Sequence, residues 1–231
     1  MSEPASDIAT NFPIVTLDGG AATGKSSTAR GVSQKLHFLH VDTGSHYRAL
    51  TYLLLQKGVA PEETDTLSSL LDEMKLSAGI DGNLATLLAD GEALSVDDLR
   101  SQEVNQSVSA FAALPSVRKR LLRYQRWHCN LVRENGFKGL VIEGRDIGSV
   151  VFPDAPFRFY LEADASTRVR RRSEEGQQDS VVERDKADSG RKNAPLLCPP
   201  GAVRINTGEF TLEEVIAQIC QIVQNAPDPA N

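Results

Sequence analysis

Short apolar runs alternate with longer amphipathic segments along most of the chain. Helical spacing marks the stretches 25–36, 45–58 and 211–224, and Leu121, Tyr124, Trp127 and Leu131 recur as core positions of a further helix. Strands that alternate with helices predict a parallel sheet covered on both faces. The expected strands are five: 13–17 (PIVTL), 38–41 (FLHV), 139–143 (GLVIE), 157–161 (FRFYL) and 202–206 (AVRIN).

Two stretches interrupt this alternation. Residues 60–99 begin with a helical pattern and continue with turn signals at Asp81-Gly82 and Asp90-Gly91 between apolar runs, which predicts a small β insert. Residues 168–193 are almost wholly polar and rich in both charges. That composition is typical of a solvated helix pair, and it also fits a mobile lid over a phosphate site.

The composition favours one globular domain over residues 13–224, with flexible tails at 1–12 and 225–231. The chain has 231 residues, of which 40% are hydrophobic, and a net charge of -6, which disfavours wholesale binding to nucleic acid or an anionic membrane. Its three cysteines lie far apart, as expected of reduced packing residues. We find no signal peptide and no apolar run of about 20 residues, so we expect a cytoplasmic protein.

One glycine-rich loop follows the first predicted strand. Residues 19–26 match G-x-x-x-x-G-K-[ST], between a strand and a helix as such a loop requires. Backbone N–H groups of the loop and the helix N-terminus cradle phosphates, Lys25 reaches the β- and γ-phosphates, and Ser26 is a candidate Mg²⁺ ligand for Mg-ATP. The predicted ATP-binding residues here are Gly19, Gly20, Ala21, Ala22, Thr23, Gly24, Lys25, Ser26 and Ser27.

The acceptor of the phosphoryl group has to be inferred from other residues. The sequence contains neither the N/T-K-x-D nor the D-x-x-G motif of a regulatory GTPase. A hydroxyl acceptor needs a general base, whereas a phosphate acceptor needs several arginines. Arg48 and Arg145 follow predicted strands at their carboxyl ends, which is the usual ligand edge of such sheets. A phosphate-bearing acceptor is therefore favoured.

Several longer motifs agree with this interpretation. "LDGGAATGKSS", "VDTGSHYRAL", "LRSQEV", "LPSVRKRLLRYQR", "EGRDIGSVVFPDAP", "RDKADSGR" with "NAPL", and "TLEEVI" stand in order between residues 14 and 223. With these motifs the chain resembles the bacterial cytidylate kinases, of the P-loop nucleoside monophosphate kinase superfamily. The resemblance implies an α/β fold with a P-loop NTPase core, in which a five-stranded parallel sheet is flanked by helices. It also implies a small α/β insert for the nucleoside monophosphate at 60–99, a shortened lid at 168–193, and a monomer.

The implied activity is transfer of the γ-phosphoryl group of ATP to CMP or dCMP. Ser109, Arg118 and Asp146 match the positions that read cytosine. Cytosine offers an N4 amino donor and the acceptors N3 and O2, so Asp146 would accept from N4 and Arg118 would donate to N3 and O2. Uracil would set a carbonyl oxygen against the Asp146 carboxylate.

The other implied roles fall on arginines and on three further residues, Lys25, Thr43 and Asp188. Lys25, Arg145, Arg184 and Arg191 are the expected catalytic residues. The remaining roles are acceptor phosphate binding by Arg48, Arg145, Arg191 and Thr43, ribose binding by Arg184 and Asp188, and contacts of the lid arginines Arg168 and Arg172 with ATP.

The chain departs from the family pattern in three places. Gly20 and Ala21 replace a proline and a serine of the phosphate loop, Glu143 replaces an aspartate, and the stretch between residues 172 and 183 is short. Whether Glu143 assists the metal stays open. Two alternatives to a (d)CMP kinase also stay open: a kinase for UMP or another small acceptor, and a nucleotide-binding protein with little catalysis.

Overall fold

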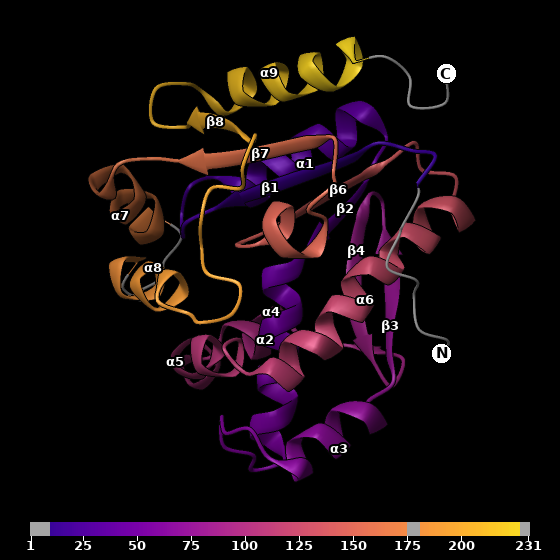
Figure 1. Cartoon of the computed structure of the whole chain (residues 1–231), viewed down its shortest axis with the longest axis vertical. Helices are drawn as coiled ribbons and strands as arrows, with labels where there is room; N and C mark the ends of the chain where they lie inside the picture. The colour runs from indigo at the N-terminus through magenta and orange to yellow at the C-terminus, as the bar shows by residue number, and fades with distance from the viewer. Residues whose placement is uncertain (1–9, 175–180, 227–231) are drawn as a thin grey trace.

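Five parallel strands form the centre of the molecule (Figure 1). The structure is a computed structural model that describes residues 10–174 and 181–226, with residues 181–184 described by their backbone alone. All four pairings between neighbours in this set are parallel, so the five expected strands are confirmed, each within two residues of its predicted ends. Their order across the sheet is β2 (Leu39–Asp42), β6 (Leu140–Gly144), β1 (Ile14–Gly19), β7 (Phe157–Glu162) and β8 (Val203–Asn206).

The strands of the expected insert join this same sheet. β4 (Leu84–Ala89) pairs in parallel with β2, and β3 (Leu76–Asp81) and β5 (Glu92–Ala93) pair antiparallel with β4. The two predicted turns are confirmed, because Gly82 and Gly91 adopt φ values of 57° and 89°, which glycine tolerates best. Within the described part of the chain the sheet therefore has eight strands, not five.

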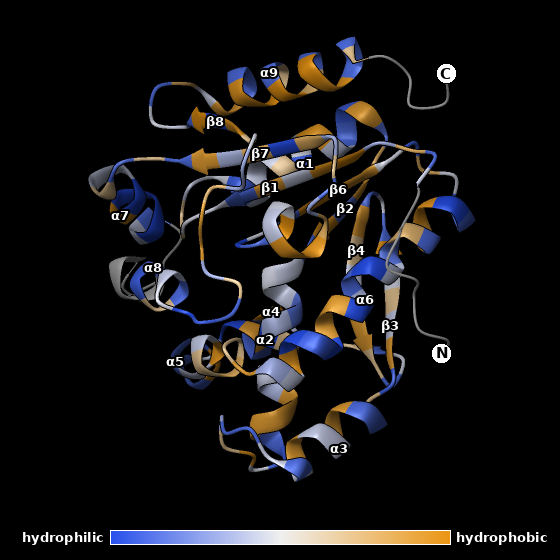
Figure 2. Ribbon diagram, in the orientation of Figure 1, coloured by the Kyte–Doolittle hydropathy of each residue, from blue (hydrophilic) through white to orange (hydrophobic). Residues whose placement is uncertain are grey.

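Helices α1 (Lys25–Leu36) and α9 (Leu212–Asn225) cover one face of the sheet. Val32 and Ile219 are fully buried there against Phe159 of β7. Thr211 caps the N-terminus of α9 and forms a capping box with Glu214, in which each side chain accepts a hydrogen bond from the other residue's backbone N–H group. Figure 2 shows the resulting division of α9 between hydrophobic and hydrophilic residues.

The long helix α6 (Pro115–Glu134) connects two core clusters on the other face. Leu121 and Tyr124 pack among the surrounding helices, Leu131 packs against the sheet, and the half-buried Trp127 contacts both clusters, so these predicted core positions are confirmed. The other elements here are α2 (Thr43–Gln56), α3 (Asp65–Glu73), α4 (Val96–Arg100), α5 (Gln102–Phe111) and the π-helical turn η1 (Ile147–Val151).

The polar stretch forms two helices beside the phosphate loop, α7 (Ala165–Glu174) and α8 (Val181–Ser189) (Figure 1). Most of the expected tails lies outside the described residues. Phe12 is an exception, because it is 8% exposed and packs in the core, which therefore begins before residue 13. Within residues 10–174 and 181–226, no helix has the length and apolar character needed to cross a membrane.

Candidate active site

The phosphate loop between β1 and α1 has the backbone shape that its glycines allow. Gly24 adopts φ 86°, and a Cβ on Gly19 would lie 2.2 Å from the carbonyl oxygen of Leu161. Lys25 folds back so that its Nζ donates to the carbonyl oxygen of Gly20 at 2.7 Å. Ala22 has φ 58°, a left-handed conformation that costs a residue with a Cβ more than it costs glycine.

Burial dominates the electrostatics of Lys25. Burial, and after it the charge of Arg145, lowers the pKa of the ammonium to about 8, against the raising effect of the neighbouring carboxylates. A triphosphate brought to this loop would meet both cations. Lys25 and the loop therefore have the placement expected from the sequence, and their role toward ATP stays a prediction.

Ser26 and Glu143 lie together at the start of α1. The Ser26 hydroxyl donates to Oε2 of Glu143 at 2.9 Å, and Nε2 of His40 lies 2.9 Å from Oε1 of the same carboxylate. Glu143 is buried, and burial followed by the Glu143 charge raises the pKa of the neighbouring Asp42 to about 6. No cluster of three or more His, Cys, Asp or Glu side chains suited to a metal occurs among the described residues.

Asp18 supports the backbone that follows β6. Its two carboxylate oxygens accept from the N–H groups of Ile147 and Gly148, each at 2.7 Å. Burial raises the pKa of Asp18 to about 6, against the lowering effect of these two bonds. The carboxylate thus fixes the first turn of η1, directly after Asp146.

Arg118 and Asp146 form a buried ion pair. Nη1 of Arg118 also donates to the carbonyl oxygen of Ala112 at 3.1 Å, and its guanidinium lies 5.6 Å from the ring centre of Tyr47. Burial raises the pKa of Asp146, while Arg118 and Arg191 oppose that shift. Arg118 and Asp146, 28 positions apart in sequence, therefore form an ion pair in which contacts with Asp146, Ala112 and Tyr47 fix the position of the guanidinium.

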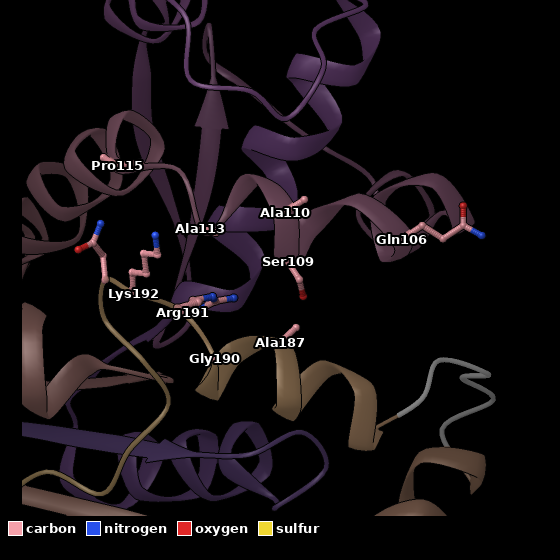
Figure 3. Close-up of a pocket in the computed structure, with 10 residues that line it drawn as sticks. Gln106, Ser109, Ala110, Ala113, Pro115, Ala187, Gly190, Arg191 and Lys192 are labelled. Carbon is pink, nitrogen blue, oxygen red and sulfur yellow. The ribbon is translucent and has the colours of Figure 1, made fainter.

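A pocket of about 700 Å³ opens between α5 and α8. Ser109 points from α5 toward Ala187 on α8, and Arg191 lies beside them (Figure 3). The structure therefore brings these two predicted acceptor residues together at one cavity. The pocket is also lined by Gln106, Lys192 and Asn193. The only sequence signal for Lys192 and Asn193 is that they directly follow the predicted site residue Arg191, and Gln106 has none.

A cluster of arginines and aspartates separates this pocket from the phosphate loop. Arg145 donates from Nη1 to the Gly19 carbonyl oxygen and to Oδ1 of Asp185, both at 3.0 Å, and its Nε lies 3.0 Å from Oδ2 of Asp188. Asp188 also pairs with Arg191, and Asp185 with Arg168. Asp188 thus orients two of the predicted phosphate-binding arginines, a contact that its predicted ribose role did not include.

Two residues of this region were missed in the sequence. Asp185 reaches the phosphate loop and accepts from the Ala21 N–H at 2.9 Å. Arg171 donates to the hydroxyl and carbonyl oxygens of Thr207 at 2.9 and 2.8 Å, and Thr207 in turn donates to the carbonyl oxygen of Thr23. Asp185 belongs to the RDKADSGR motif without an assigned role there, and Arg171 does not stand out in a stretch where charged residues are so frequent.

The remaining predicted residues are placed as follows. Arg48 donates to the carbonyl oxygen of Leu99 and to Oδ1 of Asn105, on the α4–α5 side of the molecule. The side chain of Arg184 lies outside the described residues. Thr43 donates to the carbonyl oxygen of Glu143 at 2.7 Å, Ser27 is exposed on α1, and Arg172 is half-buried on α7.

Comparison with known families identifies the chain. The cytidylate kinase family model matches residues 15–225. The chain belongs to the cytidylate kinase family. A cytidylate kinase of Streptomyces griseus is 37% identical over 218 residues, which are 91% of this chain and 92% of the relative. A cytidylate kinase of Limosilactobacillus reuteri is 34% identical and covers 93% and 96% of the two chains. A bifunctional pantoate ligase/cytidylate kinase of Synechococcus sp. is 40% identical over 90% of this chain, which corresponds to 42% of that longer protein.

Proposed function

We propose that this member of the cytidylate kinase family transfers the γ-phosphoryl group of ATP to CMP or dCMP, giving ADP and CDP or dCDP. The observation that carries the proposal is the largely buried Arg118–Asp146 ion pair, because Arg191, which lines the proposed acceptor pocket with Ser109, acts by its charge on the pKa of Asp146. A carboxylate beside a guanidinium offers an acceptor to the cytosine N4 amino group and donors to N3 and O2. Uracil presents an oxygen where this carboxylate needs a donor, so the same pair disfavours UMP.

On the donor side, we propose that the phosphate loop and Lys25 bind the triphosphate of ATP. The loop N–H groups and the ammonium supply the positive charge that phosphate oxygens require. Mg²⁺ would be held by Ser26 and assisted by Glu143, because a hydroxyl and a carboxylate within 2.9 Å of each other provide the oxygen ligands that Mg²⁺ prefers. When bound, the ion would neutralise charge on the β- and γ-phosphate oxygens.

The acceptor phosphate needs no general base, because its oxygen is already ionised at neutral pH. The chain's contribution is therefore positioning and charge stabilisation. We assign this role to Arg145, which touches the phosphate loop and, through Asp188, the pocket residue Arg191. Arg48 and Thr43 complete the proposed acceptor site, with Arg168 and Arg172 toward ATP and Arg184 toward the ribose.

The direct test is coupled measurement of ADP release with CMP, dCMP, UMP and AMP as acceptors. We expect turnover with CMP and dCMP well above that with UMP and AMP. An equal or greater rate with UMP or AMP would overturn the assignment of the acceptor, and ADP release that no acceptor stimulates would favour a binding protein with little catalysis.

Three further expectations belong to this proposal. We propose one kinase domain that begins at Phe12 and ends with α9 at Asn225, in which 60–99 serve the acceptor and 168–193 act as the lid. We also propose that the enzyme works as a monomer in the cytoplasm. Its partners would be small nucleotides only, with no role for nucleic acid or membranes.

A further inference from the structure

One carboxylate lies inside the phosphate loop. Oδ1 of Asp185, on α8, accepts from the Ala21 N–H at 2.9 Å, and its Oδ2 lies 2.6 Å from the position of a Cβ on Gly20. The N–H groups of such a loop bind phosphate oxygens when a nucleotide is present. A side-chain anion therefore occupies a donor that the nucleotide would use.

Two guanidinium groups complete the surroundings of this carboxylate. Arg145 donates to Oδ1 at 3.0 Å and Arg168 pairs with Oδ2, while Nη1 of Arg168 also lies 3.4 Å from the carbonyl oxygen of Ala21. Burial alone would raise the pKa of Asp185, but the Ala21 N–H and the two arginines outweigh it and lower the pKa below its ordinary value. A backbone N–H and two arginines around one anion are the groups that would bind a phosphoryl group.

We propose that Asp185 is an internal occupant of the phosphate loop, which the triphosphate of ATP displaces when it binds. The inference rests on the proposed binding of ATP to this loop. Before displacement, the carboxylate holds α8 against the loop and keeps Arg145 and Arg168 paired. After displacement, both arginines are available to the phosphates, and Asp188 still holds Arg145 by its Nε.

Competition of this kind has a signature that other roles lack. The contact stabilises the nucleotide-free protein and at the same time weakens ATP binding, because binding must first break it. Replacing a residue with a purely structural role would lower both the stability of the protein and its affinity for ATP. Replacing a residue that binds ATP directly would lower the affinity for ATP.

The test is Asp185→Asn, compared with the wild-type protein by calorimetric titration with ATP and, separately, with inorganic tripolyphosphate. We expect the variant to bind both ligands about tenfold more tightly, which corresponds to about 1.4 kcal/mol. We also expect its melting temperature without nucleotide to fall below that of the wild type. Unchanged or weaker binding of both ligands would overturn the proposal.

The matched control is Asp154→Asn, which makes the same substitution at an exposed carboxylate outside the proposed lid. Its affinity for ATP should stay within about twofold of wild type, because salt screens an exposed charge at a distance. An equal gain in this control would attribute the effect to net charge and overturn the specific role of Asp185. If Asp185→Asn does not fold, Asp185→Ser is measured in the same way, with the same expected direction.

The outcome is separable from that of the proposed function. Tighter binding by the variant supports the displacement even if CMP turns out not to be the acceptor. ATP binding that the variant leaves unchanged refutes the displacement and leaves the kinase assignment standing. Absence of ATP binding in both proteins would refute the displacement together with the donor half of the proposed function.

Discussion

The substitution Asp146→Asn tests the proposed recognition of cytosine at one atom. The carboxylate is 4% exposed and pairs with Arg118, so its removal to alanine would leave a guanidinium buried without its partner. Asparagine keeps the shape and one oxygen for Arg118. It replaces the other acceptor with an amide that can donate a hydrogen bond, which is what the O4 of uracil requires.

The expected magnitude follows from the bond that changes. A hydrogen bond to a charged group contributes about 1.5–3 kcal/mol, and about 1.4 kcal/mol corresponds to tenfold in a ratio of rates. The preference for CMP over UMP, expressed as the ratio of kcat/KM values, should therefore fall by about 10- to 150-fold. CMP loses the charged acceptor for N4, and UMP gains a donor for O4.

The assay is the coupled measurement of ADP release with CMP and UMP varied at saturating ATP. Asp154→Asn is the matched control, because it makes the same substitution at an exposed carboxylate eight residues further along the chain. That variant should keep the wild-type preference. If Asp146→Asn keeps it too, with the protein folded, then Asp146 does not read the base and the account of specificity is wrong.

Three other predictions concern stability. Ala22→Gly should raise the free energy of unfolding by up to about 1 kcal/mol, because φ 58° strains a residue with a Cβ; urea unfolding that gives a loss would refute this. Thr211→Ala should cost about 1 kcal/mol in the same assay, since the capping box with Glu214 is lost, and no change would show that the box contributes nothing. Burial lowers the pKa of His128, stacked on His46, to about 4, so the unfolded chain binds a proton that the folded protein excludes. The contribution of His128 to stability should be fully present above about pH 6.5 and fall by about 1.4 kcal/mol per pH unit toward pH 4, so His128→Gln should change the slope of the free energy of unfolding with pH by that amount; an unchanged slope would contradict the assignment.

The predictable part of the fold is the part that local pattern determines. The first helix was expected over 25–36 and is observed at Lys25–Leu36, because Gly24 and His37 adopt left-handed conformations at its two ends. The pairing of β4 with β2 was not predicted. β4 is half-buried, with a hairpin turn on either side, and nothing in such a segment says which distant strand lies beside it.

The candidate site likewise has a part that the sequence predicts and a part that it does not. The phosphate loop has a motif whose spacing predicts its shape, and the resemblance to the cytidylate kinases assigned Arg118 and Asp146 to the same base. Asp185 stands in the RDKADSGR motif that carries the family resemblance, but neither the motif nor the surrounding charged residues indicate a contact with the phosphate loop. Only the path of α8 past the phosphate loop gives it a partner in Ala21, 164 positions away.

Arg145 links the donor side of the proposed active site to its acceptor side. Its Nη1 touches the Gly19 carbonyl oxygen and Asp185 on the donor side, while its Nε pairs with Asp188, the partner of Arg191 in the acceptor pocket. Under the proposed function, a change in the position of this one guanidinium would therefore affect the binding of both substrates. If ATP displaces Asp185, Arg145 loses this carboxylate and keeps Asp188 at the moment when the phosphates arrive. The arginine then bridges donor and acceptor, as in-line transfer between two anions requires.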